Sequence, residues 1–212
     1  KDKTAVLRVF AKMFYNHCGF YGDDLKIAKL ERFIEKQGKT QQFREAFEKV
    51  NGAPWTETRD SFAFFEDDIV SVLQSTLGMS EQAARNWFNG EETNELSIAQ
   101  LVADIQEYVD GKGKDFRLLF MVDEVGQYIG DDGDLMINLQ SLVEEIGIRC
   151  HGKVWVMVTS QEAIDSVVHI TGNDFSKIQG RFNTRLSLSS SSVDEVIKKR
   201  VLAKTDAADQ LL

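Results

Sequence analysis

The spacing of apolar side chains along this chain changes once, near residue 110. Before that point apolar residues recur every three or four positions, which is typical of helices with one buried face. The positions that follow this spacing are Val6, Val9, Phe10, Met13 and Phe14; Ile27, Leu30, Phe33 and Ile34; Phe43, Phe47 and Val50; Phe62, Phe65, Ile69, Val72 and Leu73; Ala84 and Trp87; and Leu101, Val102, Ile105, Tyr108 and Val109. We therefore predict an all-helical region over residues 1–115.

Capping residues stand where most of these helices should begin. Asp23 or Asp24 precedes the second apolar series, and Ser80 and Ser97 precede two later ones. Short polar side chains at such positions accept hydrogen bonds from the first amides of a helix. These residues predict separate short helices rather than a few long ones.

After residue 110 the pattern favours strands. Two largely apolar runs occupy residues 116–122 and 154–158, and an amphipathic helical pattern lies between them. Short runs of this kind suit strands buried on both faces of a parallel sheet. Helical segments near 161–168 and 174–180, a short strand around 186–188 and a helix capped by Ser192 complete the pattern. We predict a partial parallel α/β core over residues 116–190 and the start of a further helix over residues 191–212.

The composition of the chain bears on whether it binds nucleic acid or a membrane, and on its cellular compartment. The net charge of −9 is spread along the chain, which argues against a main nucleic-acid-binding surface, since such a surface is normally basic. No apolar run approaches the roughly 18 residues of a membrane helix, and we expect no membrane association. The two cysteines, Cys18 and Cys150, form no disulfide framework, so we expect a cytoplasmic protein.

Polar groups follow both predicted strands. Asp123 and Glu124 come directly after the first, and Thr159, Ser160 and Gln161 come after the second. The carboxyl ends of neighbouring parallel strands share one edge of the sheet, where ligands of such sheets bind. Two adjacent acids at this edge are typical of a nucleotide-hydrolysis site. In such a site Asp123 would hold Mg²⁺, usually through water, and Glu124 would polarise the attacking water. The alternatives are a strand that ends in two solvated acids and hydroxyls that only cap the next helix.

Two arginines precede the last predicted strand. Arg181 and Arg185 lie in the segment GRFNTRL, and an arginine there could reach the nucleotide of a neighbouring subunit and stabilise transition-state charge. The alternative is that both form surface salt bridges.

The order of these segments resembles the later part of an AAA+ ATPase core. FRLLFMVDE matches a Walker B strand, VMVTSQ a sensor strand, and GRFNTRLSLSSSSVDEVIKKRV an arginine-finger region that enters the lid. The phrases LLFMVDEVGQYIG, NLQSLVEEIG and KVWVMVTSQEAID also resemble the BrxC family, the large P-loop ATPase of BREX bacteriophage-defence systems.

The resemblance implies roles for the matching residues. Asp123 would be the Mg²⁺-site acid and Glu124 the hydrolytic base. Thr159 or Ser160 would be the sensor, and Gln161 would join Asp123 as a nucleotide-binding group. Arg181 would be the arginine finger, with Arg185 as second choice. ATP and Mg²⁺ would be the cofactors, and hydrolysis would drive conformational change or assembly. The partners would be other BREX proteins, DNA contacted through the complex, and further copies of the same chain in a homo-oligomer.

One motif of such enzymes does not occur in these residues. An NTPase needs G-x-x-x-x-G-K-[ST], which opens a helix after a strand and wraps the phosphates. The loop Gly111–Lys114 precedes a strand and lacks that spacing. We expect the phosphate-binding loop upstream of Lys1, helices 23–110 as an insertion between the two Walker motifs, and little activity from these residues alone. The competing hypothesis is a non-catalytic protein-interaction module with a degenerate nucleotide fold.

Overall fold

The computed structural model describes residues 4–90, 95–129 and 132–159, with isolated positions at 182, 184, 186 and 197. The chain divides into two units, residues 1–181 and 182–212, and the elements described here all lie in the first. In chain order they are α1 (Ala5–His17), α2 (Leu25–Lys36), α3 (Thr40–Asn51), α4 (Trp55–Thr58), η1 (Arg59–Phe64), α5 (Glu66–Leu77), α6 (Glu81–Asn89), α7 (Ile98–Asp110), β1 (Leu118–Val122), α8 (Val125–Ile129), α9 (Gly133–Arg149) and β2 (Val154–Val158).

The predicted helix starts are confirmed by their caps. The side chain of Asp24 accepts hydrogen bonds from two amides of α2, and Ser80 and Ser97 each accept one at the start of α6 and α7. Asp132 does the same for α9. Each cap satisfies amides that have no partner within the helix, and this sets the residue at which the helix begins.

Three details differ from the predicted helices. The apolar series that starts at Phe62 begins as a 3₁₀ helix, and the α-helix starts only at Glu66. Val9 and Val50 were expected on buried faces but are exposed. The short helices α4 and α8 were not predicted, because four or five residues are too few to show a helical period.

The sheet consists of two parallel strands in the described residues. β1 pairs with β2 from Leu118 opposite Val154 to Val122 opposite Val158, and α9 lies between them in sequence. This confirms the mixed α/β class and the parallel pairing of the two apolar runs.

The prediction that both faces of these strands are buried is wrong for the described residues. Leu118, Phe120 and Val154 are buried on one face, whereas the opposite face exposes between 48% and 65% of each of its large apolar side chains. Those exposed residues are Leu119, Met121, Trp155 and Met157, here called the outer sheet face. A continuous apolar run cannot show which of its two faces has a covering element, because both faces are equally apolar.

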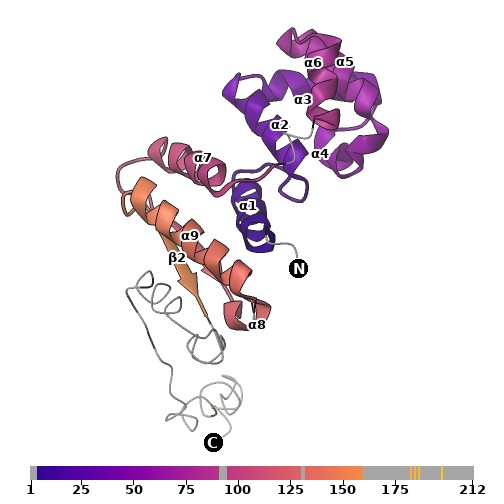
Figure 1. Ribbon diagram of the computed structural model, residues 1–212. Helices are drawn as coiled ribbons and strands as arrows, with labels where there is room; N and C mark the ends of the chain where they lie inside the picture. Colours follow the sequence, from indigo (N-terminus) through magenta and orange to yellow (C-terminus); the bar gives the residue numbers. More distant parts are fainter. Residues whose placement is uncertain are drawn as a thin grey trace, which may run out of the picture. The chain divides into compact units, whose positions relative to one another are not determined.

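The buried side chains form two clusters. The first joins α1, α7, α8 and α9 to the inner face of the sheet, and the second lies among α2, α3, α4, α5 and α6. Figure 1 shows α2 to α6 gathered as one helical group, with α9 running beside β2 elsewhere in the same unit. Helices α1 and α7 therefore pack with the sheet. The domain limits predicted at residues 115 and 190 stay predictions.

A polar network joins α1, α2 and α7. The hydroxyl of Tyr15 donates to buried Asp104 at 2.8 Å, and Arg32 contacts the same carboxylate at 3.1 Å. Arg32 and Lys36 also both contact Glu107. Burial together with the neighbouring Asp104 carboxylate raises the pKa of Tyr15, so the hydroxyl keeps its proton and acts as a donor. These charged groups hold α2, which lines the helical cluster, against helices of the sheet-containing cluster.

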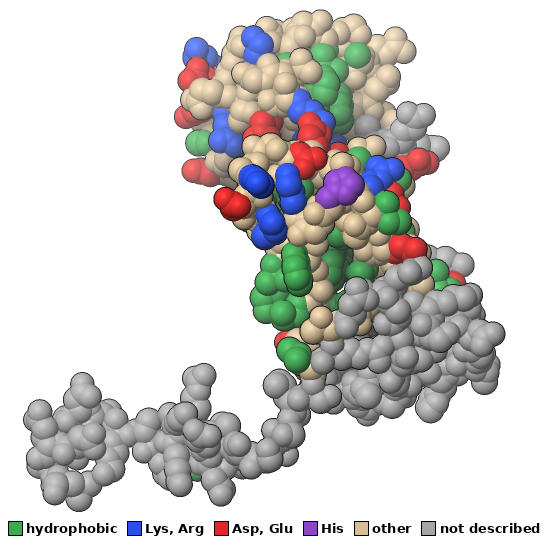
Figure 2. Space-filling view, turned by 90° about the vertical axis from the view of Figure 1, so that its left-hand side faces the viewer, with side chains coloured by type: hydrophobic (Ala, Val, Ile, Leu, Met, Phe, Trp, Pro, Cys, Tyr) green, Lys and Arg blue, Asp and Glu red, His purple; other side chains and the backbone are tan. Residues whose placement is uncertain are grey.

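Surface charge in Figure 2 is intermixed: acidic and basic side chains alternate on this face without a broad basic field. This agrees with the overall negative charge of the chain. Among the described residues, no helix is long and apolar enough to cross a membrane.

Candidate functional site

The candidate site lies where β1 and β2 end side by side. Because the ladder closes with Val122 opposite Val158, the next residues on both strands, Asp123 and Thr159, are neighbours. The amide of Thr159 donates to the carbonyl of Val122 at 3.0 Å, so the pairing continues one residue past the strands. The register therefore brings a carboxylate and a hydroxyl together from positions 36 residues apart.

Asp123, Glu124 and Thr159 form a closed set of hydrogen bonds. The Thr159 hydroxyl donates to Asp123 Oδ1, and the Glu124 amide donates to both Asp123 Oδ1 at 3.1 Å and Thr159 Oγ1 at 3.0 Å. Hydrogen bonds to a carboxylate are about twice as strong as those between neutral groups. The set fixes the rotamer of Asp123 although that residue is exposed.

Glu124 has an unusual backbone conformation. Its φ angle is +53°, in the left-handed region that costs an ordinary residue about 1–2 kcal/mol. The surrounding hydrogen bonds hold it there: its amide is bound as described, and its carbonyl accepts from the amide of Tyr128 at 3.2 Å in α8. Strained backbone of this kind is concentrated at functional sites, and here it falls on the residue predicted to be the hydrolytic base.

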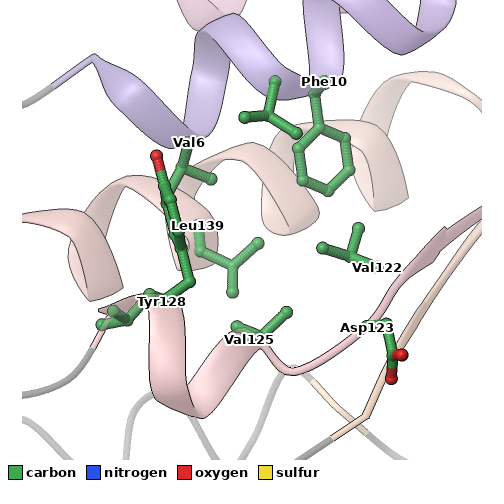
Figure 3. A pocket seen from close by; sticks show the side chains of 9 residues that line it. Val6, Phe10, Val122, Asp123, Val125, Tyr128 and Leu139 are labelled. Carbon is green, nitrogen blue, oxygen red and sulfur yellow. The ribbon is translucent and has the colours of Figure 1, made fainter.

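An apolar hollow of about 180 Å³ lies beside Asp123. In Figure 3 the side chains of Val6, Phe10 and Leu139 face into it, whereas the carboxylate of Asp123 stands at its edge and points away. A hollow with so few polar groups offers nothing to bind a phosphate. The chemistry of the site therefore lies on the other side of Asp123, at the edge of the sheet.

The oxygen donors at this edge suit a hard cation. Carboxylate oxygens and water are the ligands that Mg²⁺ prefers, and in nucleotide sites one or two carboxylates together with substrate phosphates are enough. Both hydrogen bonds that Asp123 forms with described residues fall on Oδ1, which leaves Oδ2 as the oxygen available to a ligand. Within the described ranges no three His, Cys, Asp or Glu side chains group as a complete metal site, so Mg²⁺ at Asp123 would need ligands besides these side chains.

The structure thus brings together three of the seven predicted site residues: Asp123, Glu124 and Thr159. The other four, Ser160, Gln161, Arg181 and Arg185, lie outside the described residues, and their roles stay predictions. Sequence reasoning missed the left-handed backbone of Glu124, because only glycine signals such a conformation in a sequence. It also missed the contribution of α1 to the wall beside Asp123, since helical spacing identifies a buried face but not what that face contacts.

Comparison with known proteins leaves the family open. No protein-family model matches the chain, and no solved structure matches it significantly. The similarity to AAA+ cores and to the BrxC family therefore rests on the motifs of the sequence.

Proposed function

We propose that this chain forms part of an AAA+-like, P-loop ATPase core, with Asp123 and Glu124 at its hydrolytic edge. The observation that carries the proposal is the set formed by Asp123, Glu124 and Thr159 at the carboxyl ends of two parallel strands, with Glu124 held at φ +53°. Ligands of open α/β sheets bind at this edge. The left-handed backbone of Glu124 costs free energy, and packing alone gives no reason to retain it beside a carboxylate that is fixed by hydrogen bonds.

Each of the predicted site residues has its own role in ATP hydrolysis. Asp123 would hold Mg²⁺ through Oδ2, directly or through water, and Glu124 would polarise the attacking water or accept its proton. A Mg²⁺ ion held there would supply positive charge that stabilises the transferred phosphoryl group. The proposal requires a phosphate-binding loop, and the sequence G-x-x-x-x-G-K-[ST] does not occur in these 212 residues. Arg181 or Arg185 would serve as the arginine finger, and Ser160 with Gln161 would contact the nucleotide.

We further propose that the chain belongs to the BrxC family of BREX defence systems, on the strength of the three phrases quoted from its sequence. Its partners would then be other BREX proteins in the cytoplasm, DNA through the complex, and further copies of itself. The mixed surface charge supports an indirect contact with DNA rather than a direct one.

Removing the carboxylate of Glu124 tests the ATPase proposal. In the full-length protein, Glu124→Gln should lower the ATP turnover rate by at least 100-fold, as roughly expected for loss of a general base, while the Kd for ATP stays within a factor of about three. Glu48→Gln, at an exposed position of α3, is the matched control and should leave turnover unchanged. Normal turnover in Glu124→Gln would refute the proposal.

A second candidate function is a protein-interaction module without catalysis. It is favoured by the outer sheet face, where four large apolar side chains are about half exposed or more. Contiguous apolar surface of this kind marks sites of protein contact. Titration of the full-length protein with ATP separates the two candidates: absence of nucleotide binding would favour the module.

A further inference from the structure

The amide, the carbonyl and the hydroxyl of Thr159 all form hydrogen bonds with residues at the end of β1 and just after it. Its amide donates to the carbonyl of Val122, and its hydroxyl donates to Asp123 Oδ1. The hydroxyl oxygen accepts from the amide of Glu124, and the carbonyl accepts from the amide of Val125 at 3.0 Å. Thr159, the residue that follows β2, thus binds four consecutive residues, from Val122 at the end of β1 to Val125 at the start of α8.

This pattern limits what the hydroxyl can do. A threonine hydroxyl has one proton, and here that proton is donated to a carboxylate. It cannot at the same time be donated to a phosphate oxygen, which is what the predicted sensor role requires. The oxygen of the same hydroxyl accepts a hydrogen bond from the Glu124 amide and so stabilises the left-handed turn at Glu124.

We propose that Thr159 is a positioning residue that fixes Asp123 and the turn at Glu124, and not a nucleotide sensor. Its hydroxyl binds Asp123 Oδ1, which fixes the carboxylate and leaves Oδ2 for the cation of the proposed ATPase. Its bond to the Glu124 amide sets the direction in which the Glu124 side chain leaves the backbone. The proposal rests on the ATPase function for its catalytic consequence, but the hydrogen-bond clamp itself stands on the geometry alone.

The residue type fits this task. A β-branched side chain has few χ1 rotamers and suits the end of a strand, so the hydroxyl is already oriented toward β1. Serine keeps the hydroxyl and loses the methyl group, whereas valine keeps the shape and loses the hydroxyl. The pair Thr159→Ser and Thr159→Val therefore separates the hydrogen bonds from the packing.

The first measurement concerns the clamp and needs no activity. By amide hydrogen exchange in the full-length protein, Thr159→Val should speed exchange of the Glu124 amide at least 10-fold, while Thr159→Ser changes it by less than threefold. Thr58→Val is the matched control, because its hydroxyl binds only carbonyls within α4 and its N-cap; it should leave Glu124 unchanged. Unchanged exchange at Glu124 in a folded Thr159→Val protein would overturn the clamp.

The second measurement separates positioning from sensing. Residues that orient a metal ligand typically change metal affinity by about 10- to 100-fold, so Thr159→Val should raise the Mg²⁺ concentration for half-maximal ATP turnover by that factor. The Kd for ATP measured without Mg²⁺ should stay within about threefold, and Thr159→Ser should restore the Mg²⁺ dependence. Weaker ATP binding with an unchanged Mg²⁺ dependence would instead assign Thr159 as a sensor and overturn the proposal. If Thr159→Val releases the Glu124 amide but Glu124→Gln leaves turnover unchanged, the role of Glu124 as hydrolytic base is refuted and the clamp remains.

Discussion

The left-handed backbone of Glu124 makes an unusual prediction about stability. Glu124→Ala and Glu124→Gly both remove the carboxylate, so they differ only in whether a Cβ atom remains at φ +53°. At ordinary positions alanine is the more stabilising of the two residues. At position 124 we expect the reverse order.

The size of the effect follows from two opposing terms. A residue with a Cβ loses about 1–2 kcal/mol in the left-handed region, whereas glycine loses roughly 0.5–1 kcal/mol through its greater backbone freedom in the unfolded chain. Combining the two, we expect Glu124→Gly to be more stable than Glu124→Ala by about 0.5–1 kcal/mol. Both variants keep the backbone amide and carbonyl, so the hydrogen bonds to Thr159 and from Tyr128 can remain.

Equilibrium unfolding in urea measures this difference. Ile137 provides the matched control, because it is an exposed position in the middle of α9 and belongs to the same sheet-containing part of the fold. There alanine should be more stable than glycine by about 1 kcal/mol. If alanine is also the more stable residue at position 124, the strain assigned to Glu124 does not exist. Neither 124 variant should hydrolyse ATP in the full-length protein, so relief of strain would come with loss of function.

Three further predictions follow from buried and exposed groups. Asp104→Ala leaves the buried Tyr15 hydroxyl without its acceptor and removes one of the two carboxylates that Arg32 contacts, so urea unfolding should show a loss of about 3–5 kcal/mol. Tyr15→Phe should then add little to Asp104→Ala, although alone it costs about 1.5–3 kcal/mol. A hydrogen bond from α2 lowers the pKa of Glu107 from its ordinary value of 4.5. Its contribution to stability is therefore present above about pH 4.5 and lost as the pH falls through the lower folded pKa, and Glu107→Gln should flatten that part of the pH–stability curve. Trp155→Ala, on the outer sheet face, should change stability by less than about 1 kcal/mol, whereas Phe120→Ala, on the buried face of the same sheet, should cost about 3–5 kcal/mol in the same urea assay.

The helices and their limits were predictable because each depends on local signals. The spacing of Phe43 and Phe47 marks a buried helical face, and both residues are buried. Asp24 and Ser97 predict helix starts through a bond that reaches only two or three residues along the chain. The strand pairing was predictable for a related reason: two apolar runs joined by a helical connection have few other ways to pack.

What the sequence did not reveal depends on contacts between distant segments. Leu119 and Phe120 are both large and apolar, yet one is exposed and the other buried, because only one face of the sheet lies against α1 and α9. The division of the buried residues into two clusters has the same origin. Tyr15 and Asp104 are 89 positions apart, and nothing in either local pattern shows that they bind each other.

The candidate site combines both kinds of information. Asp123 and Glu124 were identifiable as acids that follow an apolar run, but their chemistry depends on Thr159, which reaches them only because β1 and β2 are in register. A shift of one residue in that register would place a different side chain opposite Asp123 and leave the left-handed turn at Glu124 without its hydroxyl acceptor. Helix α9 packs in the same buried cluster as the inner face of the sheet, and its Leu139 also lines the hollow beside Asp123. Packing around Leu139 and hydrogen bonding at Thr159 are therefore two constraints on one geometry. A substitution in α9 that preserves the helix but alters its packing should therefore shift the positions of Asp123 and Glu124, although it contacts neither carboxylate.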